Sequence, residues 1–393
     1  GRASTAPMPS RFQHAVSFGI PSTAVATVVA AALLSPGTRP AAPNDPGPIG
    51  TPFATPVESG KHPIDVVFAV DTTGSMDRLI DGAKRTVWSI ATHIRQTDPD
   101  ASLRIGLVAY RDTGDDYVTR PFSLTHDLDA VYAELASYEA SGGGDAPEHV
   151  AAALRDALGM RWRAGAKKLV FVVGDAPPAP RDDARPYDML AREAGTSGII
   201  VNAIRCGDDP MTAHAFQQIA SLGGGDFSTI AQDGGVQQVA TPYDDRLAEL
   251  SASIDRTAVI AGDESVRAGH AAKMAAAEAA PAAAKADRAS YWAKTAKGGA
   301  MVRTEGDLVG AYATGALDLG KVAPGALPAD LRARSAPEIK AELARRAEAR
   351  AQAQREIDEL TRKRDAYLSA RKDATGGGGF DTAVKATVEK QIK

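Results

Sequence analysis

The sequence has little of what would cross-link a small secreted domain or hold a soft metal ion. Cys206 is the one cysteine among 393 residues, so an intrachain disulfide cannot form and cysteine-rich zinc or iron–sulfur sites are excluded. Aromatic residues make up only 5% of the chain, whereas alanine is abundant. We therefore expect one well-packed core accompanied by helical segments, rather than a core that extends through the whole chain.

The chain also lacks a marked excess of charge of either sign. Its formal net charge is −4 and its isoelectric point is near 6.0, so it is not expected to bind nucleic acid. No Gly-x-x-x-x-Gly-Lys-Ser/Thr loop is present, which excludes a P-loop ATPase. The seven histidines lie in no recognisable catalytic context. These observations favour a protein that is not an enzyme, and we assign no catalytic residues.

A short apolar segment near the N-terminus is typical of an export signal. Arg11 precedes an apolar run at residues 24–34, and a Ser-Pro-Gly tripeptide ends it. The run is shorter than the ~20 residues that a membrane-spanning helix needs. We predict a signal peptide or an uncleaved N-terminal anchor at residues 1–37, followed by a linker at residues 38–60. This predicts a secreted, periplasmic or cell-envelope protein, which contacts a membrane only if the anchor is retained.

Apolar runs and helical patterns alternate between residues 61 and 260, which we take as one domain. Runs rich in β-branched residues predict strands, and apolar residues at three- and four-residue steps predict helices. This alternation is typical of an α/β fold with a doubly wound, mostly parallel sheet. Pro121 marks the third strand as an edge, and the short turn before it predicts an antiparallel hairpin. The predicted strands are 64–70, 103–110, 117–122, 167–174, 199–204 and 225–230, and the predicted helices are 79–94, 127–140, 147–158, 184–194, 211–222 and 241–254.

The composition changes beyond residue 260. Residues 261–335 are rich in alanine and glycine, and we expect a linker region that buries little. Residues 336–393 are predicted to be a helical C-terminal segment, because Ser-Ala-Pro-Glu at 335–338 is typical of the start of a helix. Charges of both signs dominate this segment and its apolar stripe is imperfect, which indicates a solvated helix or half of a helical hairpin. A spacer or docking arm is the expected role.

Side chains that carry oxygen atoms follow the ends of predicted strands in three loops. Asp71, Thr73 and Ser75 follow the first strand, Asp145 and Glu148 lie in a glycine-rich loop, and Asp175 follows the strand at residues 167–174. Oxygen ligands suit Mg²⁺, Mn²⁺ or Ca²⁺ rather than zinc. Each motif alone is weak evidence, since Ser75 could simply cap a helix. Together, after strands that would end at one edge of a sheet, they predict a shared cation site.

In this order the residues resemble the metal-ion-dependent adhesion site of von Willebrand factor A domains. That site has Asp-x-Ser/Thr-x-Ser after the first strand, a ligand in a middle loop and an Asp after the fourth strand. The resemblance covers residues 61–260 and implies the metal ligands Asp71, Thr73, Ser75, Glu148 and Asp175. The middle loop is similar to the Asp-x-Pro-Glu loop of integrin β domains. Asp145 and Asp112 are therefore candidates for a second metal site, or for support of the first.

The resemblance implies a non-catalytic, adhesion-type module that binds proteins through a divalent metal. Mg²⁺, or Mn²⁺ or Ca²⁺ in its place, would keep an open coordination position for an acidic side chain of a partner protein. Three carboxylates around one cation would leave surplus negative charge, so we expect modest affinity for an acidic ligand. Two alternatives are an intracellular von Willebrand factor A partner of an ATPase complex and a haloacid-dehalogenase-like phosphatase. The phosphatase is disfavoured because Thr73 stands where those enzymes carry the Asp that serves as general acid.

Overall fold

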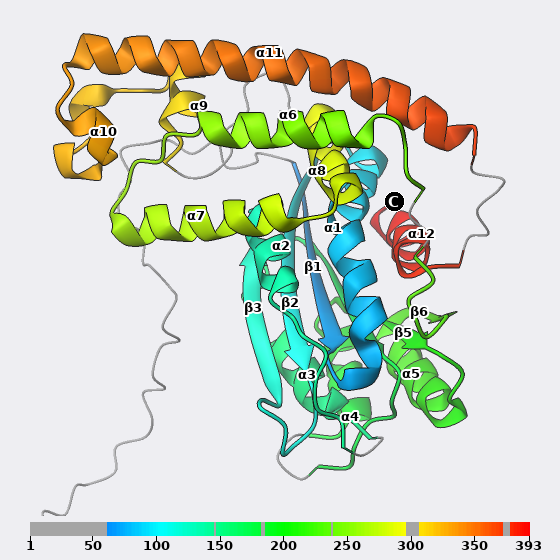
Figure 1. Ribbon diagram of the computed structural model, residues 1–393. Helices are drawn as coiled ribbons and strands as arrows, with labels where there is room; N and C mark the ends of the chain where they lie inside the picture. The colour runs from blue at the N-terminus through cyan, green and yellow to red at the C-terminus, as the bar shows by residue number, and fades with distance from the viewer. Residues whose placement is uncertain (1–60, 145–146, 182–184, 237–238, 296–305, 372–377) are drawn as a thin grey trace, which may run out of the picture. The chain divides into compact units, whose positions relative to one another are not determined.

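The computed structural model describes residues 61–144, 147–181, 185–236, 239–295, 306–371 and 378–393. The predicted signal peptide or anchor, the linker at residues 38–60 and Asp145 lie outside these ranges. Within them, a six-stranded sheet has the strand order β3-β2-β1-β4-β5-β6 (Figure 1). Its strands are β1 (His62–Asp71), β2 (Ala101–Tyr110), β3 (Thr119–Thr125), β4 (Lys167–Gly174), β5 (Ile199–Cys206) and β6 (Gly224–Ile230).

The strand pairings confirm a doubly wound, mostly parallel sheet with one antiparallel edge strand. β1 pairs in parallel with β2 and β4, and β5 pairs in parallel with β4 and β6. β3 runs antiparallel to β2 at one edge of the sheet. Pro121 has no backbone N–H to donate to a neighbouring strand, and a residue of an edge strand can do without one. Because β1 and β4 are parallel neighbours, the loops that follow Asp71 and Gly174 both leave from the carboxyl ends of the strands, on the same side of the sheet.

Helices bury both faces of the central strand. Every residue of β1 from Ile64 to Asp71 is buried, as the continuous apolar run of a parallel strand requires. Phe68 and Val70 belong to a core on one face, whereas Val67 and Ala69 belong to a core on the other. The first core includes residues of α1 (Asp77–Thr97), α2 (Leu128–Ala136) and α12 (Phe380–Ile392), and the second includes residues of α3 (Val150–Leu158), α4 (Tyr187–Thr196) and α5 (Pro210–Leu222).

The helix after the glycine-rich loop begins later than the sequence predicts. Pro147 is predicted as its first residue, but α3 begins at Val150. Glu148 instead pairs with the loop after β4: its N–H donates to Pro177 O (2.9 Å), and its carbonyl accepts from Ala179 N (2.7 Å). The prediction is wrong because these long-range backbone hydrogen bonds hold residue 148 in a bridge with β4's loop instead of in a helical turn.

Further helices follow the sheet in the sequence and pack against α1, against α2 and against one another. They are α6 (Asp244–Thr257), α7 (Glu264–Ala279), α8 (Ala282–Thr295), α9 (Leu308–Ala313), α10 (Ala329–Arg332) and α11 (Ala336–Ser369). α7 and α8 occupy an alanine-rich segment that is expected to bury little. α8 nevertheless buries Ala284, Ala286 and Ala289, because these small side chains face its contacts with α1 and α6. No helix in the described ranges is both long enough and apolar enough to cross a bilayer.

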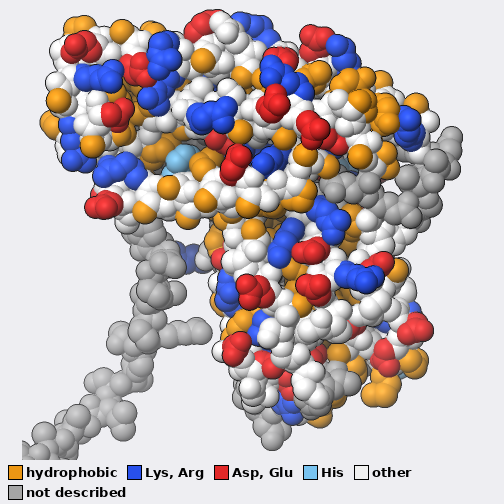
Figure 2. Space-filling model, in the orientation of Figure 1, with side chains coloured by type: hydrophobic (Ala, Val, Ile, Leu, Met, Phe, Trp, Pro, Cys, Tyr) orange, Lys and Arg blue, Asp and Glu red, His pale blue; other side chains and the backbone are white. Residues whose placement is uncertain are grey.

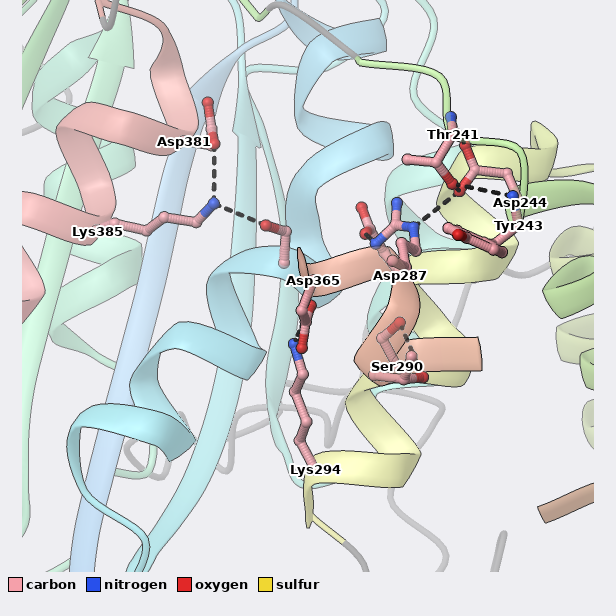
Figure 3. Close-up of polar contacts among 12 residues, drawn as sticks. Thr241, Tyr243, Asp244, Asp287, Ser290, Lys294, Asp365, Asp381 and Lys385 are labelled. Carbon is pink, nitrogen blue, oxygen red and sulfur yellow. Dashed lines mark hydrogen bonds and ion pairs between the residues drawn. The ribbon is translucent and has the colours of Figure 1, made fainter. Parts of the chain in front are cut away.

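Ion pairs connect α11 to α6 and α8, as Figure 3 shows. Arg364 of α11 donates to Asp244 of α6 (2.8 Å) and to Asp287 of α8 (2.7 Å), and Lys294 pairs with Asp365 at 2.8 Å. α11 begins with the expected capping box, formed by Ser335 and Glu338. Charges of both signs are interspersed on the surface of these helices in the view of Figure 2. The long helix is therefore solvated along one side and anchored along the other.

Candidate metal centre

The loop after β1 brings the first predicted motif together. Asp71, the last residue of β1, is fully buried, and its Oδ1 accepts hydrogen bonds from Thr73 N (2.8 Å) and Thr73 Oγ1 (2.7 Å). Thr73 Oγ1 lies 3.5 Å from Ser75 Oγ. Ser75 is exposed and lies within a 3₁₀ turn (Gly74–Met76), and Met76, not Ser75, is the N-cap of α1. The two hydroxyls therefore lie beside the carboxylate, and Ser75 does not serve as a helix cap.

The second carboxylate oxygen of Asp71 has no protein partner. Asp71 Oδ2 is buried without a hydrogen bond, which is rare for a polar atom in a folded protein. Burial raises the pKa of Asp71 to about 7, although the hydrogen bonds from Thr73 oppose the shift. The charge of Asp175 raises this pKa further, and the charge of Arg111 lowers it. A carboxylate in this position is expected to hold either a proton or a cation.

The glycine-rich loop passes close to this carboxylate. Gly143 has a φ of +77°, and a Cβ there would lie 2.9 Å from Thr73 Cβ and 3.4 Å from Glu148 Oε1. A glycine is therefore required at this position, both for its backbone conformation and for the contact. Glu148 is 2% exposed and is fixed to the loop after β4 through its backbone. The second predicted loop thus lies against the first, and Glu148 lies near Thr73.

Asp175, the first residue after β4, lies at the more open side of the site. It is partly exposed, and its backbone carbonyl accepts a hydrogen bond from Thr212 Oγ1 of α5 (3.1 Å). Its carboxylate Oδ2 accepts a hydrogen bond of 2.5 Å from Gln232 Nε2. The same amide nitrogen lies 3.4 Å from the carbonyl of Ser75, so Gln232 contacts two of the predicted loops. Gln232 was not predicted from the sequence, where no motif marks the loop after β6.

Tyr110, the last residue of β2, is buried next to the acids of the site. The hydroxyl of Tyr110 donates to Val173 O (3.1 Å), and burial raises the pKa of this phenol well above its usual value. The charges of Asp71, Glu148 and Asp175 raise it further, which places all three acids around one tyrosine. The sequence prediction missed Tyr110 because it reads as an ordinary apolar position of a buried strand.

Arg111, directly after β2, forms hydrogen bonds to two separate loops next to the site. Its Nε donates to Thr72 O (3.1 Å), and its Nη2 donates to Glu139 O (2.8 Å). Its guanidinium also lies over the ring of Tyr117, 4.4 Å from the centroid. This buried arginine was also missed, although an arginine after a buried strand is a signal that could have indicated it.

Of the two candidates for a second metal site, the structure describes only Asp112. Asp145 lies outside the described residues. Asp112 is 3% exposed and forms an ion pair with Arg181, whose Nε donates to Asp112 Oδ1 at 3.0 Å. The carboxylate of Asp112 is thus neutralised by a cation of the chain itself.

The donor set fits a hard cation that keeps several waters. Within the described ranges, no group of three or more His, Cys, Asp or Glu side chains is arranged to hold a metal ion by itself. Mg²⁺ does not need such a group, because it is commonly bound through one or two carboxylates and completes its shell with water. Asp71 Oδ2, which lacks a hydrogen bond, and the hydroxyls of Thr73 and Ser75 are oxygen atoms of this kind. Ser75 and Asp175 lie on the accessible side, where a water or a partner's group could reach the ion.

Comparison with protein families agrees with the resemblance noted from the motifs. Residues 65–241 match the von Willebrand factor A domain model, which covers less than half of the chain. This match supports a von Willebrand factor A domain in that range, which contains nearly all of the sheet and all of the predicted metal ligands.

Individual relatives match about a third of the chain. An ariadne-like RING finger protein of Acanthamoeba polyphaga mimivirus is 29% identical over 133 residues, which are 34% of this chain and 13% of that protein. The von Willebrand factor A domain-containing protein 7 of Rattus norvegicus is 33% identical over 126 residues, which are 32% of this chain and 13% of that protein. The chain thus spans a small fraction of the length of these curated relatives. Among solved structures, the SpRpn10 VWA domain is 14% identical with a TM-score of 0.34, over 43% of this chain and 88% of that one.

Proposed function

We propose that this chain is a protein-binding module that depends on a divalent metal ion. Asp71, Thr73, Ser75, Glu148 and Asp175 would hold Mg²⁺, or Mn²⁺ or Ca²⁺ in its place, directly or through water. The ion would keep one coordination position for an acidic side chain of a partner protein. The module would act without catalysis, in a secreted, periplasmic or cell-envelope protein.

The buried Oδ2 of Asp71 is the observation that carries this proposal. A fully buried carboxylate oxygen without a hydrogen bond costs free energy unless a proton or a cation occupies it. The hydroxyl of Thr73 donates to Asp71 Oδ1, so its lone pairs would be available to a cation. A site built only to bury a protonated acid would have no need of these oxygens beside it.

The charge balance of the site sets how strongly an acidic ligand would bind. Mg²⁺ readily keeps water ligands, and an anionic side chain of a partner would replace one of these waters. The exposed Ser75 and partly exposed Asp175 mark the side on which such a group would approach. The nearby negative charges of Asp71, Glu148 and Asp175 would weaken this bond, which supports modest affinity.

A pull-down with matched variants tests the proposal. The full chain, immobilised, is incubated with an envelope extract in Mg²⁺ or in EDTA, and wild type is compared with Asp71→Ala and Asp245→Ala. Asp245 is an exposed acid of α6, so its removal changes the net charge equally but leaves the site intact. We expect proteins that bind wild type and Asp245→Ala only in Mg²⁺, and that are lost with Asp71→Ala. Metal-dependent capture that survives in Asp71→Ala would refute the proposal.

A further inference from the structure

We propose that Arg181 is a positioning residue for Glu148, and that it acts through its ion pair with Asp112. The pair would close two loops over the backbone of Glu148 and so hold this acid at the metal site. The inference rests on the proposed metal-binding function and adds to that site a residue outside the predicted ligand set.

The backbone of Glu148 lies between two loops that follow different strands. Towards the loop after β4, Glu148 N donates to Pro177 O (2.9 Å), and Glu148 O accepts from Ala179 N (2.7 Å). Towards the loop after β2, the next amide along the chain, His149 N, donates to Arg111 O (3.2 Å). The backbone of the acid is thus the middle one of three short segments, and its position depends on how the two outer segments are held.

The ion pair joins these two outer segments to each other. Asp112 directly follows Arg111, and Arg181 lies two residues after Ala179. Arg181 Nε donates to Asp112 Oδ1 at 3.0 Å and Arg181 Nη2 donates to Asp112 Oδ2, so the contact is bidentate. Asp112 is 3% exposed, whereas the side chain of Arg181 is 31% exposed. Because a bidentate pair has a fixed geometry, it ties the loop after β2 to the loop after β4 beside Glu148.

The loop that carries Asp112 also holds the glycine-rich loop ahead of Glu148. Asp112 N donates to Asp115 Oδ2 (3.3 Å), and both carboxylate oxygens of Asp115 lie 3.3 Å from Gly143 N, which donates to them. A Cβ on Gly143 would lie 3.4 Å from Glu148 Oε1, so this glycine lies against the side chain of the acid. An Asp112 that is fixed by Arg181 therefore constrains the chain before Glu148 as well as the chain after it.

Positioning and a simple effect of charge predict opposite results for one of the two partners. The pair lies beside the site, because Arg111, the neighbour of Asp112, donates to Thr72 O in the loop after β1. If the pair acted by charge alone, loss of the guanidinium would strengthen cation binding and loss of the carboxylate would weaken it. If the pair positions Glu148, loss of either partner should weaken metal binding by about 10-fold, the lower end of the usual effect of groups that orient a metal ligand.

The test uses the full chain with substitutions in this ion pair and in a matched one. Arg181→Gln and Asp112→Asn each remove one charge, and the double variant removes both, so that it leaves no buried charge without its partner. Arg192→Gln and Asp188→Asn are the controls, because these two residues form an ion pair at the surface of α4. Isothermal titration with Mn²⁺ should show about 10-fold weaker binding by all three variants of the first pair and unchanged binding by the controls. The double variant should bind no more weakly than either single variant, because both substitutions break the same contact.

Hydrogen exchange in EDTA reports on the backbone of Glu148 without any metal. The amides of Glu148 and Ala179, which join this acid to the loop after β4, should exchange faster in the three variants of the ion pair than in wild type and the controls. Metal binding by Arg181→Gln that equals or exceeds that of wild type would overturn the inference, and so would unchanged exchange of these amides. The proposed function would stand in both cases, because wild type binds the metal. If wild type binds no metal in the titration, the proposed function is wrong and the inference fails with it.

Discussion

At the scale of single residues, the pKa of Asp71 makes metal binding depend on pH. Burial raises this pKa to about 7, and an ion that uses Oδ2 must displace the proton held there. We predict that the dissociation constant for Mn²⁺, measured by isothermal titration, rises roughly 20-fold between pH 7.5 and pH 5.5, because one proton of that pKa leaves for each ion bound. An affinity that does not change over this interval would show that Asp71 is not a ligand.

The same pKa predicts how stability depends on pH without metal. The folded-state pKa of about 7 lies above the ordinary value of 3.8, so Asp71 supports folding fully only at low pH and loses that contribution as pH rises through 7. Asp71→Asn removes the titration. In urea unfolding with EDTA, the stability of this variant relative to wild type should therefore increase between pH 4 and pH 7.5, by on the order of 3 kcal/mol. A constant difference would contradict the prediction.

At the scale of elements, one buried arginine connects the C-terminal helices to the sheet domain. Arg288 of α8 is 1% exposed and donates to Asp129 of α2 (2.6 Å) and to Asp255 of α6 (2.7 Å). Its guanidinium also lies 4.3 Å from the ring centroid of Trp292. One buried cation thus pairs with acids from two other helices, α2 and α6.

Arg288→Met should destabilise the protein by about 3–5 kcal/mol, because it removes the buried guanidinium that pairs with both Asp129 and Asp255. Arg246→Met is the control, since Arg246 forms exposed ion pairs with Glu249 and Glu356 and should change the unfolding midpoint little. Urea unfolding followed by far-UV circular dichroism measures both. Equal effects of the two substitutions would mean that burial of the Arg288 ion pairs has no energetic consequence.

Elements that are determined by local pattern were predictable from the sequence, and contacts between distant segments were not. The run at residues 64–70 predicted a buried parallel strand because both of its faces are apolar, and the structure confirms it as the centre of the sheet. The start of α3 was wrong because backbone hydrogen bonds from the loop after β4 decide it. Gln232 and Arg288 gave no signal, since an isolated glutamine in a loop and an arginine in an alanine-rich helix acquire their roles only from partners far along the chain.

At the scale of the whole molecule, the last helix completes the core of the first strand. The ring of Phe380 lies 6.1 Å from that of Phe68, which stacks on Phe171 at 5.3 Å between centroids. Phe380 is 3% exposed and belongs to the same core as Trp88 of α1. The described residues also belong to one compact unit. Because α12 fills the core beside β1, the sheet and the C-terminal helices should unfold as a single cooperative unit, in contrast to a domain with an independent arm.

We therefore predict one transition in urea, with the same midpoint by tryptophan fluorescence and by far-UV circular dichroism. Phe380→Ala should lower stability by about 3–5 kcal/mol, because it removes a buried ring and leaves a cavity beside Phe68. Val266→Ala is the control, since Val266 of α7 is 41% exposed and its truncation leaves no buried cavity. Two separate transitions, with Phe380→Ala affecting only one of them, would show that the C-terminal helices fold apart from the sheet. A single transition that shifts as a whole in Phe380→Ala would show that β1 and α12 stabilise each other, because neither could lose its packing while the other stays folded.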